Sequence, residues 1–197
     1  MVVKFFWGKP CPAERGGGTN RAAQSRKGCV MALVYLGLGS NLGDREKNLD
    51  AARQALAQLR GSVLIRNAPL YETPPVGGPS GQDKYLNSAS LMETSLRPHE
   101  FLREIQAVER GVGRIRENET VRWGPRVIDI DILFWDDAVF DGEELAVPHP
   151  RMAERAFVLL PMADLDKDFL HPVLDLTIAE LLQRLDLENE GIQRLPV

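Results

Sequence analysis

The spacing of apolar residues changes along the chain between a two-residue and a helical period, which predicts an α+β domain. Patterns typical of strands occur four times, over residues 33–39, 63–71, 85–94 and 127–135. Asp44 is placed to cap a helix that runs to about residue 60, and Pro98 is placed to begin a second helix. The resulting order, βαββαβ, describes a ferredoxin-like sandwich with an antiparallel sheet.

Further elements follow the last of these strands. Asp141-Gly142 predicts a turn into a short return strand over residues 145–147. Apolar residues at helical spacing predict helices around residues 153–162 and 177–185. We therefore expect the sandwich to carry extra C-terminal elements.

The first 31 residues differ from the rest of the chain because they are basic, Gly-rich and without clear periodicity. Residues 1–30 hold six Lys or Arg and one Glu, and no apolar core of a secretory signal follows the first basic residue. We interpret residues 1–31 as a disordered leader or as sequence upstream of a true start at Met31. One domain over residues 32–187 and a C-terminal tail over residues 188–197 complete the predicted organisation.

Charge and cysteine usage narrow the function classes. Past residue 30 the chain is acidic, with 18 Lys or Arg against 27 Asp or Glu, which argues against nucleic acid as a main partner. No apolar run reaches the roughly 18 residues that cross a bilayer. The two cysteines, Cys11 and Cys29, both lie in the leader, so we expect no disulfide framework and a cytoplasmic protein.

The clearest chemical pattern lies in the fourth predicted strand. Side chains alternate along a strand, so Asp129 and Asp131 should share one face while the isoleucines around them point into the core. Two such carboxylates lie roughly 6.5 Å apart along the strand. They can converge on one or two Mg²⁺ ions, which take few carboxylates together with substrate phosphates. The alternative is an acidic outer face on a half-exposed strand.

A group of arginines precedes this strand, at Arg114, Arg116, Arg122 and Arg126, with Trp123 among them. Guanidinium groups bind phosphate oxygens through two parallel hydrogen bonds. Arginines next to paired aspartates therefore favour a site for a polyphosphate and its metals. A solvated loop with surface ion pairs is the alternative.

Two further features leave their role open. The segment from Gly37 to Gly43 has G-x-G-x-x-x-G spacing, which fits neither a dinucleotide fingerprint nor a P-loop. A tight strand-to-helix turn, in which the backbone passes close to another group, is the simpler interpretation. His149 lies between two prolines, and its constrained backbone suits either a donor to a phosphate oxygen or a loop histidine bonded to a carbonyl.

Several segments occur together and in order: Gly39-Ser40-Asn41-Leu42-Gly43, Tyr71-Glu72-Thr73-Pro74-Pro75, Tyr85-Leu86-Asn87, Arg122-Trp123-Gly124-Pro125-Arg126 with Asp129-x-Asp131, and Val147-Pro148-His149-Pro150-Arg151-Met152. With them the chain from about Ala32 to Leu185 resembles the 6-hydroxymethyl-7,8-dihydropterin pyrophosphokinases of folate biosynthesis. The run R-W-G-P-R-x-x-D-x-D is highly specific. The resemblance implies transfer of pyrophosphate from ATP to the hydroxymethyl group of 6-hydroxymethyl-7,8-dihydropterin, with release of AMP.

The resemblance also implies roles for individual residues. Asp129 and Asp131 match the family's Mg²⁺ ligands, with two ions expected, and together with Arg114 and Arg126 they form the implied catalytic set. Residues that match contacts to ATP are Gln106, Glu109, Arg116, Arg122, His149 and Arg155. Residues that match contacts to the pterin are Thr73, Pro74, Val76, Tyr85, Asn87, Trp123 and Phe157.

The chain departs from the family pattern at a few positions. The segment between Arg116 and Arg122 is longer than in the bacterial pattern, and Glu144 and Ala146 stand where a basic and a hydroxyl residue are expected near the nucleotide. The chain is too short for a fused second enzyme of the pathway, so we expect a single activity. We also expect a monomer.

Two other functions fit part of the pattern. A metal-dependent nucleotide hydrolase would use the same aspartates with water as the acceptor, but it would not need pterin-matching residues such as Asn87, Trp123 and Phe157. Ferredoxin-like sheets also bind RNA or small effectors without catalysis. An RNA-binding sheet should carry exposed aromatic residues and a basic face, which this acidic chain does not predict.

Overall fold

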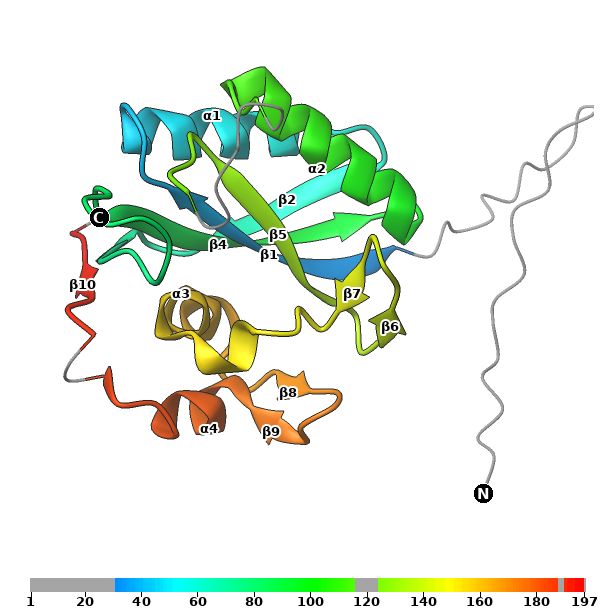
Figure 1. Cartoon of the computed structure of the whole chain (residues 1–197). Coiled ribbons are helices and arrows are strands. Elements are labelled where there is room, and N and C mark those ends of the chain that lie inside the picture. The colour runs from blue at the N-terminus through cyan, green and yellow to red at the C-terminus, as the bar shows by residue number, and fades with distance from the viewer. Residues whose placement is uncertain (1–30, 116–123, 188–189, 197) are drawn as a thin grey trace, which may run out of the picture.

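The computed structural model describes residues 31–115, 124–187 and 190–196 (Figure 1). Its centre is an antiparallel sheet in the order β10-β3-β4-β1-β5, in which β2 also pairs with β4. The strands of this sheet are β1 (Ala32–Ser40), β2 (Ser62–Asn67), β3 (Tyr71–Thr73), β4 (Tyr85–Thr94), β5 (Asp129–Trp135) and β10 (Gln193–Arg194). With α1 (Arg45–Ala57) and α2 (Pro98–Val112) as crossovers, this topology confirms the predicted ferredoxin-like sandwich.

Helices cover both faces of the sheet (Figure 1). Helices α1 and α2 lie on one face, while α3 (Ala156–Asp166) and α4 (Ile178–Gln183) lie on the other. Asp44 caps α1 as predicted, because its carboxylate accepts a hydrogen bond from the amide of Lys47 at 3.2 Å. The extra C-terminal elements therefore form a third layer of the fold.

The second predicted strand, residues 63–71, is two strands in the structure. β2 pairs with the second half of β4 and β3 with its first half. Pro69 lies between them, and its missing amide hydrogen and fixed φ interrupt a strand. The carbonyl of Ala68 accepts hydrogen bonds from the Arg53 guanidinium and from Ser88 Oγ, each at 2.9 Å. Side chains from α1 and β4 thus hold the break in place.

The two faces of the sheet carry different cores. The face under α1 and α2 is packed with buried aliphatic and aromatic side chains, among them Val34, Leu36, Leu38, Leu49, Leu56, Met92, Phe101, Ile105, Ile128, Ile130 and Ile132. The face under α3 and α4 has a smaller core, which includes Tyr35, Ala89, Leu133, Phe134, Leu159, Met162 and Ile178. Because this second core is smaller, part of the sheet face under α3 and α4 is left to line a pocket.

Short elements complete the C-terminal half. β6 (Phe140–Asp141) and β7 (Ala146–Val147) form the predicted hairpin, and η2 (Met152–Glu154) precedes α3. A second hairpin, β8 (Leu170–His171) with β9 (Leu176–Thr177), was not predicted. The segment expected to be a C-terminal tail contains β10, which adds to the sheet beside β3. Among the described residues, no helix has the length and apolar character needed to cross a membrane.

Candidate active site

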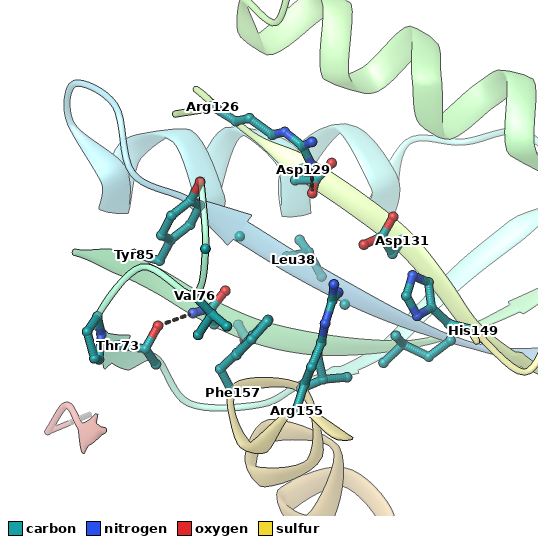
Figure 2. Close-up of a pocket in the computed structure, with 18 of the residues that line it drawn as sticks. Leu38, Thr73, Val76, Tyr85, Arg126, Asp129, Asp131, His149, Arg155 and Phe157 are labelled. Carbon is teal, nitrogen blue, oxygen red and sulfur yellow. Dashed lines mark hydrogen bonds and ion pairs between the residues drawn. The ribbon is translucent and has the colours of Figure 1, made fainter. Parts of the chain in front are cut away.

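A pocket lies on the second face of the sheet, at the N-terminal end of α3 (Figure 2). Its lining residues from the sheet are Gly37, Leu38, Gly39, Thr73, Tyr85, Asn87, Ser88, Asp129, Asp131 and Leu133. Those from the surrounding segments are Pro74, Val76, Gly77, Gln82, Arg126, His149, Arg155, Phe157 and Val158. The fold thus gathers into one pocket residues that are far apart in the sequence.

Asp129 and Asp131 lie on the pocket floor, on one face of β5. The isoleucines that alternate with them are buried in the core on the other face, which confirms the predicted alternation. Their partners on β1 are glycines, Gly39 opposite Asp129 and Gly37 opposite Asp131. Because these partners have no side chains, the side chains of Asn87 and Leu133 can lie over β1 beside the carboxylates.

The surroundings of Asp131 shift its ionisation. Burial raises the pKa of Asp131 to about 7, and the negative charge of Asp129 adds to the shift, while Arg126 and Arg155 oppose it. A carboxyl group that keeps its proton near neutral pH gains strongly from a nearby cation, which stabilises its ionised form. The donor set therefore suits a bound metal ion.

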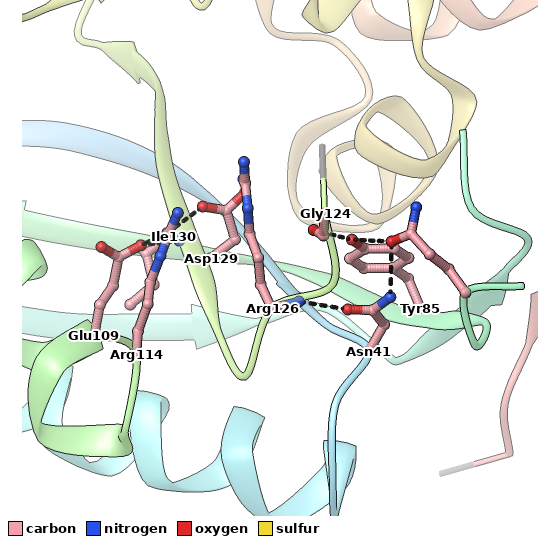
Figure 3. A network of polar contacts seen from close by, with 9 residues as sticks. Asn41, Tyr85, Glu109, Arg114, Gly124, Arg126, Asp129 and Ile130 are labelled. Carbon is pink, nitrogen blue, oxygen red and sulfur yellow. Dashed lines mark hydrogen bonds and ion pairs between the residues drawn. The ribbon is translucent and has the colours of Figure 1, made fainter. Parts of the chain in front are cut away.

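A buried charge network lies behind Asp129 (Figure 3). Arg114 Nη1 donates to Glu109 Oε1 at 2.6 Å and to Asp129 Oδ1 at 2.5 Å. The same Glu109 oxygen accepts the backbone amide of Ile130 at 2.8 Å. Glu109 and Arg114 are 1% and 4% exposed, so they orient Asp129 from behind and do not line the pocket.

Arg126 contacts the other oxygen of Asp129, since its Nη1 pairs with Asp129 Oδ2. Asn41 holds the backbone of Arg126 through two hydrogen bonds. Asn41 Oδ1 accepts the backbone amide of Arg126 at 2.7 Å, and the backbone amide of Asn41 donates to the Arg126 carbonyl at 3.0 Å. Asn41 Nδ2 also reaches Gln82 Oε1 at 3.4 Å and the Asp83 carbonyl at 3.3 Å. Asn41 therefore links two segments that flank the pocket (Figure 3).

His149 is positioned by a β-bulge in β5. The register between β1 and β5 shifts by one residue at Leu133, and the Leu133 carbonyl accepts the His149 amide at 3.0 Å. Burial lowers the pKa of His149, and the charge of Arg155 lowers it further. His149 Nδ1 accepts the amide of Arg151 at 3.3 Å, which leaves Nε2 as the donor of a neutral ring that lies beside Asp131 (Figure 2).

The start of α3 supplies Arg155 and Phe157 to the same pocket (Figure 2). The Arg155 guanidinium carbon lies 5.6 Å from the centroid of the Phe157 ring. Arg155 Nε is buried and has no hydrogen-bond partner among the described residues. An unsatisfied buried N–H is costly, and an anionic ligand in the pocket would satisfy it.

The opposite wall is built from Thr73 and Asn87, which are 2% and 6% exposed. Asn87 Nδ2 donates to Thr73 Oγ1 at 2.7 Å (Figure 2). Asn87 Oδ1 lies over Gly39, 2.9 Å from where a Cβ at that position would be. A glycine at residue 39 is therefore what allows the Asn87 amide to lie across β1.

Apolar side chains complete this wall. Pro74, Val76, Tyr85 and Phe157 line the pocket beside the polar pair, and the Tyr85 hydroxyl donates to the Gly124 carbonyl at 3.2 Å. A pocket of this composition suits a flat ring system with polar edges.

Comparison with known proteins shows the family of the chain. The family model described as 7,8-dihydro-6-hydroxymethylpterin-pyrophosphokinase (HPPK) matches residues 35–167. The chain belongs to the HPPK family. The predicted ATP-dependent pyrophosphokinase of folate biosynthesis is thereby confirmed at the level of the family.

Individual relatives agree with this family. The chain is 41% identical to the 2-amino-4-hydroxy-6-hydroxymethyldihydropteridine pyrophosphokinase of Methylorubrum extorquens, over 84% of this chain and 99% of that protein. It is 40% identical to the enzyme of the same name from Pseudomonas aeruginosa, over 85% and 99% of the two chains. A crystal structure of Plasmodium falciparum HPPK-DHPS with pterin and p-hydroxybenzoate has a TM-score of 0.66 at 17% identity. This chain spans about half of that larger protein (46%, against 85% of its own length), and the likeness supports the HPPK fold.

Eleven of the HPPK residues singled out in the sequence line the pocket: Thr73, Pro74, Val76, Tyr85, Asn87, Arg126, Asp129, Asp131, His149, Arg155 and Phe157. Three others do not line it. Gln106 lies half-buried on α2, while Glu109 and Arg114 support Asp129. Arg116, Arg122 and Trp123 lie outside the described residues.

Some residues in or beside the pocket were missed by sequence reasoning. Gly37 and Gly39 were placed correctly in the first strand, which is β1 in the structure, but no place in a pocket was predicted for them, and they form part of the floor. Their two-residue spacing on a buried strand was the available signal, since it places both on one face. Asn41 and Gln82 carried no such signal, because their contacts join segments distant in sequence.

Proposed function

We propose that this pocket carries out the HPPK reaction, with ATP on the side of Arg126, His149 and Arg155 and the pterin on the side of Thr73 and Asn87. The observation that carries this assignment is the position of Asp129 and Asp131 on the floor between a cationic wall and an amide–hydroxyl wall. Such a floor places a metal-binding pair where a phosphate chain and an acceptor hydroxyl would meet.

The pterin half is supported by its donors and acceptors. Asn87 offers an amide with both a donor and an acceptor, and Thr73 Oγ1, which accepts from Asn87, keeps its hydrogen for a ligand. Both side chains are buried, so a ring that lacked matching polar edges would leave them unpaired. Pro74, Val76 and Phe157 would contact the faces of the ring, and Trp123 stays a prediction in this role.

The nucleotide half is supported by its charges. Arg126 and Arg155 are guanidinium groups that line the pocket, and the His149 ring offers its Nε2 hydrogen beside them. These groups would bind phosphate oxygens and neutralise the charge that develops during transfer. We propose that Arg114 and Glu109 act indirectly, by fixing the orientation of Asp129. Contacts from Gln106, Arg116 and Arg122 stay predictions.

The metal is proposed to be Mg²⁺, with two ions as the expected number, held by Asp129 and Asp131. Among the described residues, no group of three or more His, Cys, Asp or Glu side chains converges to hold a metal ion. The remaining ligands would be phosphate oxygens and water, which is the usual coordination of Mg²⁺ in phosphoryl-transfer enzymes. When bound, Mg²⁺ would neutralise phosphate charge and acidify the acceptor hydroxyl.

In the proposed reaction the hydroxymethyl oxygen of the pterin attacks the β-phosphorus of ATP, the bond from that phosphorus to the oxygen of the α-phosphate breaks, and AMP leaves. The protein positions the two substrates and supplies positive charge, since transfer of this kind needs little covalent help. Arg126 now pairs with Asp129 Oδ2, so a cation at that oxygen would release its guanidinium to the phosphates.

The deciding experiment measures AMP formation from ATP and Mg²⁺, with and without 6-hydroxymethyl-7,8-dihydropterin. AMP that appears in step with the pterin diphosphate supports the proposal. ADP and phosphate without a pterin requirement would point to the nucleotide hydrolase, and the absence of turnover would point to a binding protein. A monomeric state and a cytoplasmic location stay predictions.

A further inference from the structure

The C-terminal strand β10 lies against the part of the sheet that carries the pterin-side wall. β10 pairs with β3, and the amide of Leu195 donates to the Leu70 carbonyl at 2.8 Å. β3 has three residues and ends at Thr73. Without β10, β3 would be a short edge strand with open backbone groups, and such strands fray easily.

One carboxylate joins this strand pair to α3. Asp164 Oδ2 accepts the Tyr71 hydroxyl of β3 at 2.6 Å, and Asp164 Oδ1 pairs with Arg194 Nη2 of β10 at 3.3 Å. Phe157 lies two helical turns before Asp164 and hence on the same face of α3. The helix that presents Phe157 to the pocket is therefore anchored to both strands.

The beginning of the same segment touches the pocket wall. Gly191 has a φ of 60°, a conformation that favours glycine. A Cβ at this position would lie 3.7 Å from Pro74 Cγ. Since Pro74 lines the pocket, the C-terminal segment supports this side of the wall from behind.

We propose that residues 191–196 are a positioning element for the pterin. They hold the Thr73–Pro74 wall and α3 at the separation that lets Phe157 and the wall contact the two faces of the ring. This inference rests on the proposed assignment of the pterin to this wall. The segment contacts Leu70, β3, Pro74 and α3, and Leu195 also packs against the core under α1 and α2. The nucleotide-side residues Arg126 and His149 belong to other elements. Loss of the segment should therefore affect the pterin and spare ATP.

The test is steady-state kinetics with each substrate varied in turn, on the full chain and on a chain that ends after Glu190. We expect the KM for the pterin to rise about tenfold, which is about 1.4 kcal/mol, because a displaced wall would lose contact with one face of the ring. The KM for ATP should stay within about twofold. Arg194→Ala should raise the pterin KM about two- to fivefold, the range for loss of an exposed ion pair. Arg194→Lys should restore most of it.

Controls separate this inference from the site assignment. Arg184→Ala removes the same charge from an exposed position at the end of α4 and should change neither KM. Asn87→Ala should raise the pterin KM strongly, and if it does not, the site assignment itself fails. If Asn87→Ala raises it but truncation and Arg194→Ala do not, or if they raise both KM values equally, the positioning role is wrong. If the truncated chain does not fold, as judged by circular dichroism, Arg194→Ala decides alone.

Discussion

The two faces of β5 show how one strand serves both the core and the candidate chemistry. On one face, Ile130 and Ile132 are buried under α1 and α2, as is Ile128 just before the strand. On the other, Asp129 and Asp131 lie opposite glycines of β1 and line the pocket. The first face gains stability from close apolar packing. The second gives up that packing to hold like charges close together, which is the arrangement expected at a functional site.

The largest effect is expected when both carboxylates are removed from the pocket face of β5. Asp129→Ala with Asp131→Ala should lower kcat by at least about a thousandfold, on the scale of the several kcal/mol that a metal site contributes. The fold should be retained, because neither side chain belongs to an apolar core. Mg²⁺-dependent AMP formation and the far-ultraviolet circular dichroism spectrum would be measured together.

The control for this pair is Asp137→Ala, which removes an exposed carboxylate just past the end of the same strand. It should leave turnover unchanged. Substantial activity in the double variant would contradict the proposed metal site.

A substitution on the core face of β5 should lower stability and leave turnover largely intact. Ile130→Ala removes a side chain that is 4% exposed, and we expect it to lower the free energy of unfolding by about 2–5 kcal/mol. The folded fraction should keep most of its kcat at low temperature. Urea unfolding beside single-turnover rates would check both expectations, and a large loss of kcat without a loss of stability would show that the two faces are not separate.

The dependence of the unfolding free energy on pH measures how much the buried carboxylate of Asp131 destabilises the fold. The raised pKa of Asp131, about 7, means that the metal-free folded chain binds more protons than the unfolded chain between about pH 4 and pH 7. Protonated Asp131 therefore stabilises the folded chain relative to ionised Asp131. This stability is fully present below about pH 4 and is lost as the pH rises through 7. Asp131→Asn should therefore raise the unfolding free energy by about 1–3 kcal/mol above pH 7.

This gain should shrink toward zero near pH 4, as measured by denaturant unfolding in the presence of a chelator. The variant should be catalytically impaired at every pH. An equal gain at pH 4 and pH 8 would show that the stabilisation does not come from the carboxylate charge.

The smallest expected effect concerns the glycines of the floor. Gly39→Ala would place a Cβ 2.9 Å from Asn87 Oδ1 and displace the amide, so we expect the KM for the pterin to rise about tenfold, which is about 1.4 kcal/mol. Gly37→Ala is the matched control on the same strand face, where the Cβ would meet the side chain of Leu133 at 3.3 Å. It should change the pterin KM less, and equal effects would argue against a specific role for Asn87.

Local patterns account for much of what was predicted correctly. The βαββαβ order, the cap at Asp44 and the shared face of Asp129 and Asp131 follow from periodicity and capping chemistry, which act within a few residues. The split of the second strand was missed because both of its halves pair with β4, although Pro69 was visible in the sequence. The β8–β9 hairpin and β10 are two-residue strands and too short for a periodic pattern.

The sequence by itself determined the family, the reaction class and the residues that carry charge or hydrogen bonds, because these depend on residue type and spacing. The tertiary structure decided which of them meet. It placed Thr73, Asn87, Asp129 and His149 in one pocket, it buried Glu109 and Arg114 behind Asp129, and it kept Gln106 out of the lining. These outcomes depend on strand pairing, on the bulge at Leu133 and on the packing of α3 against the sheet. Such contacts join residues distant in the chain, and no local pattern encodes them.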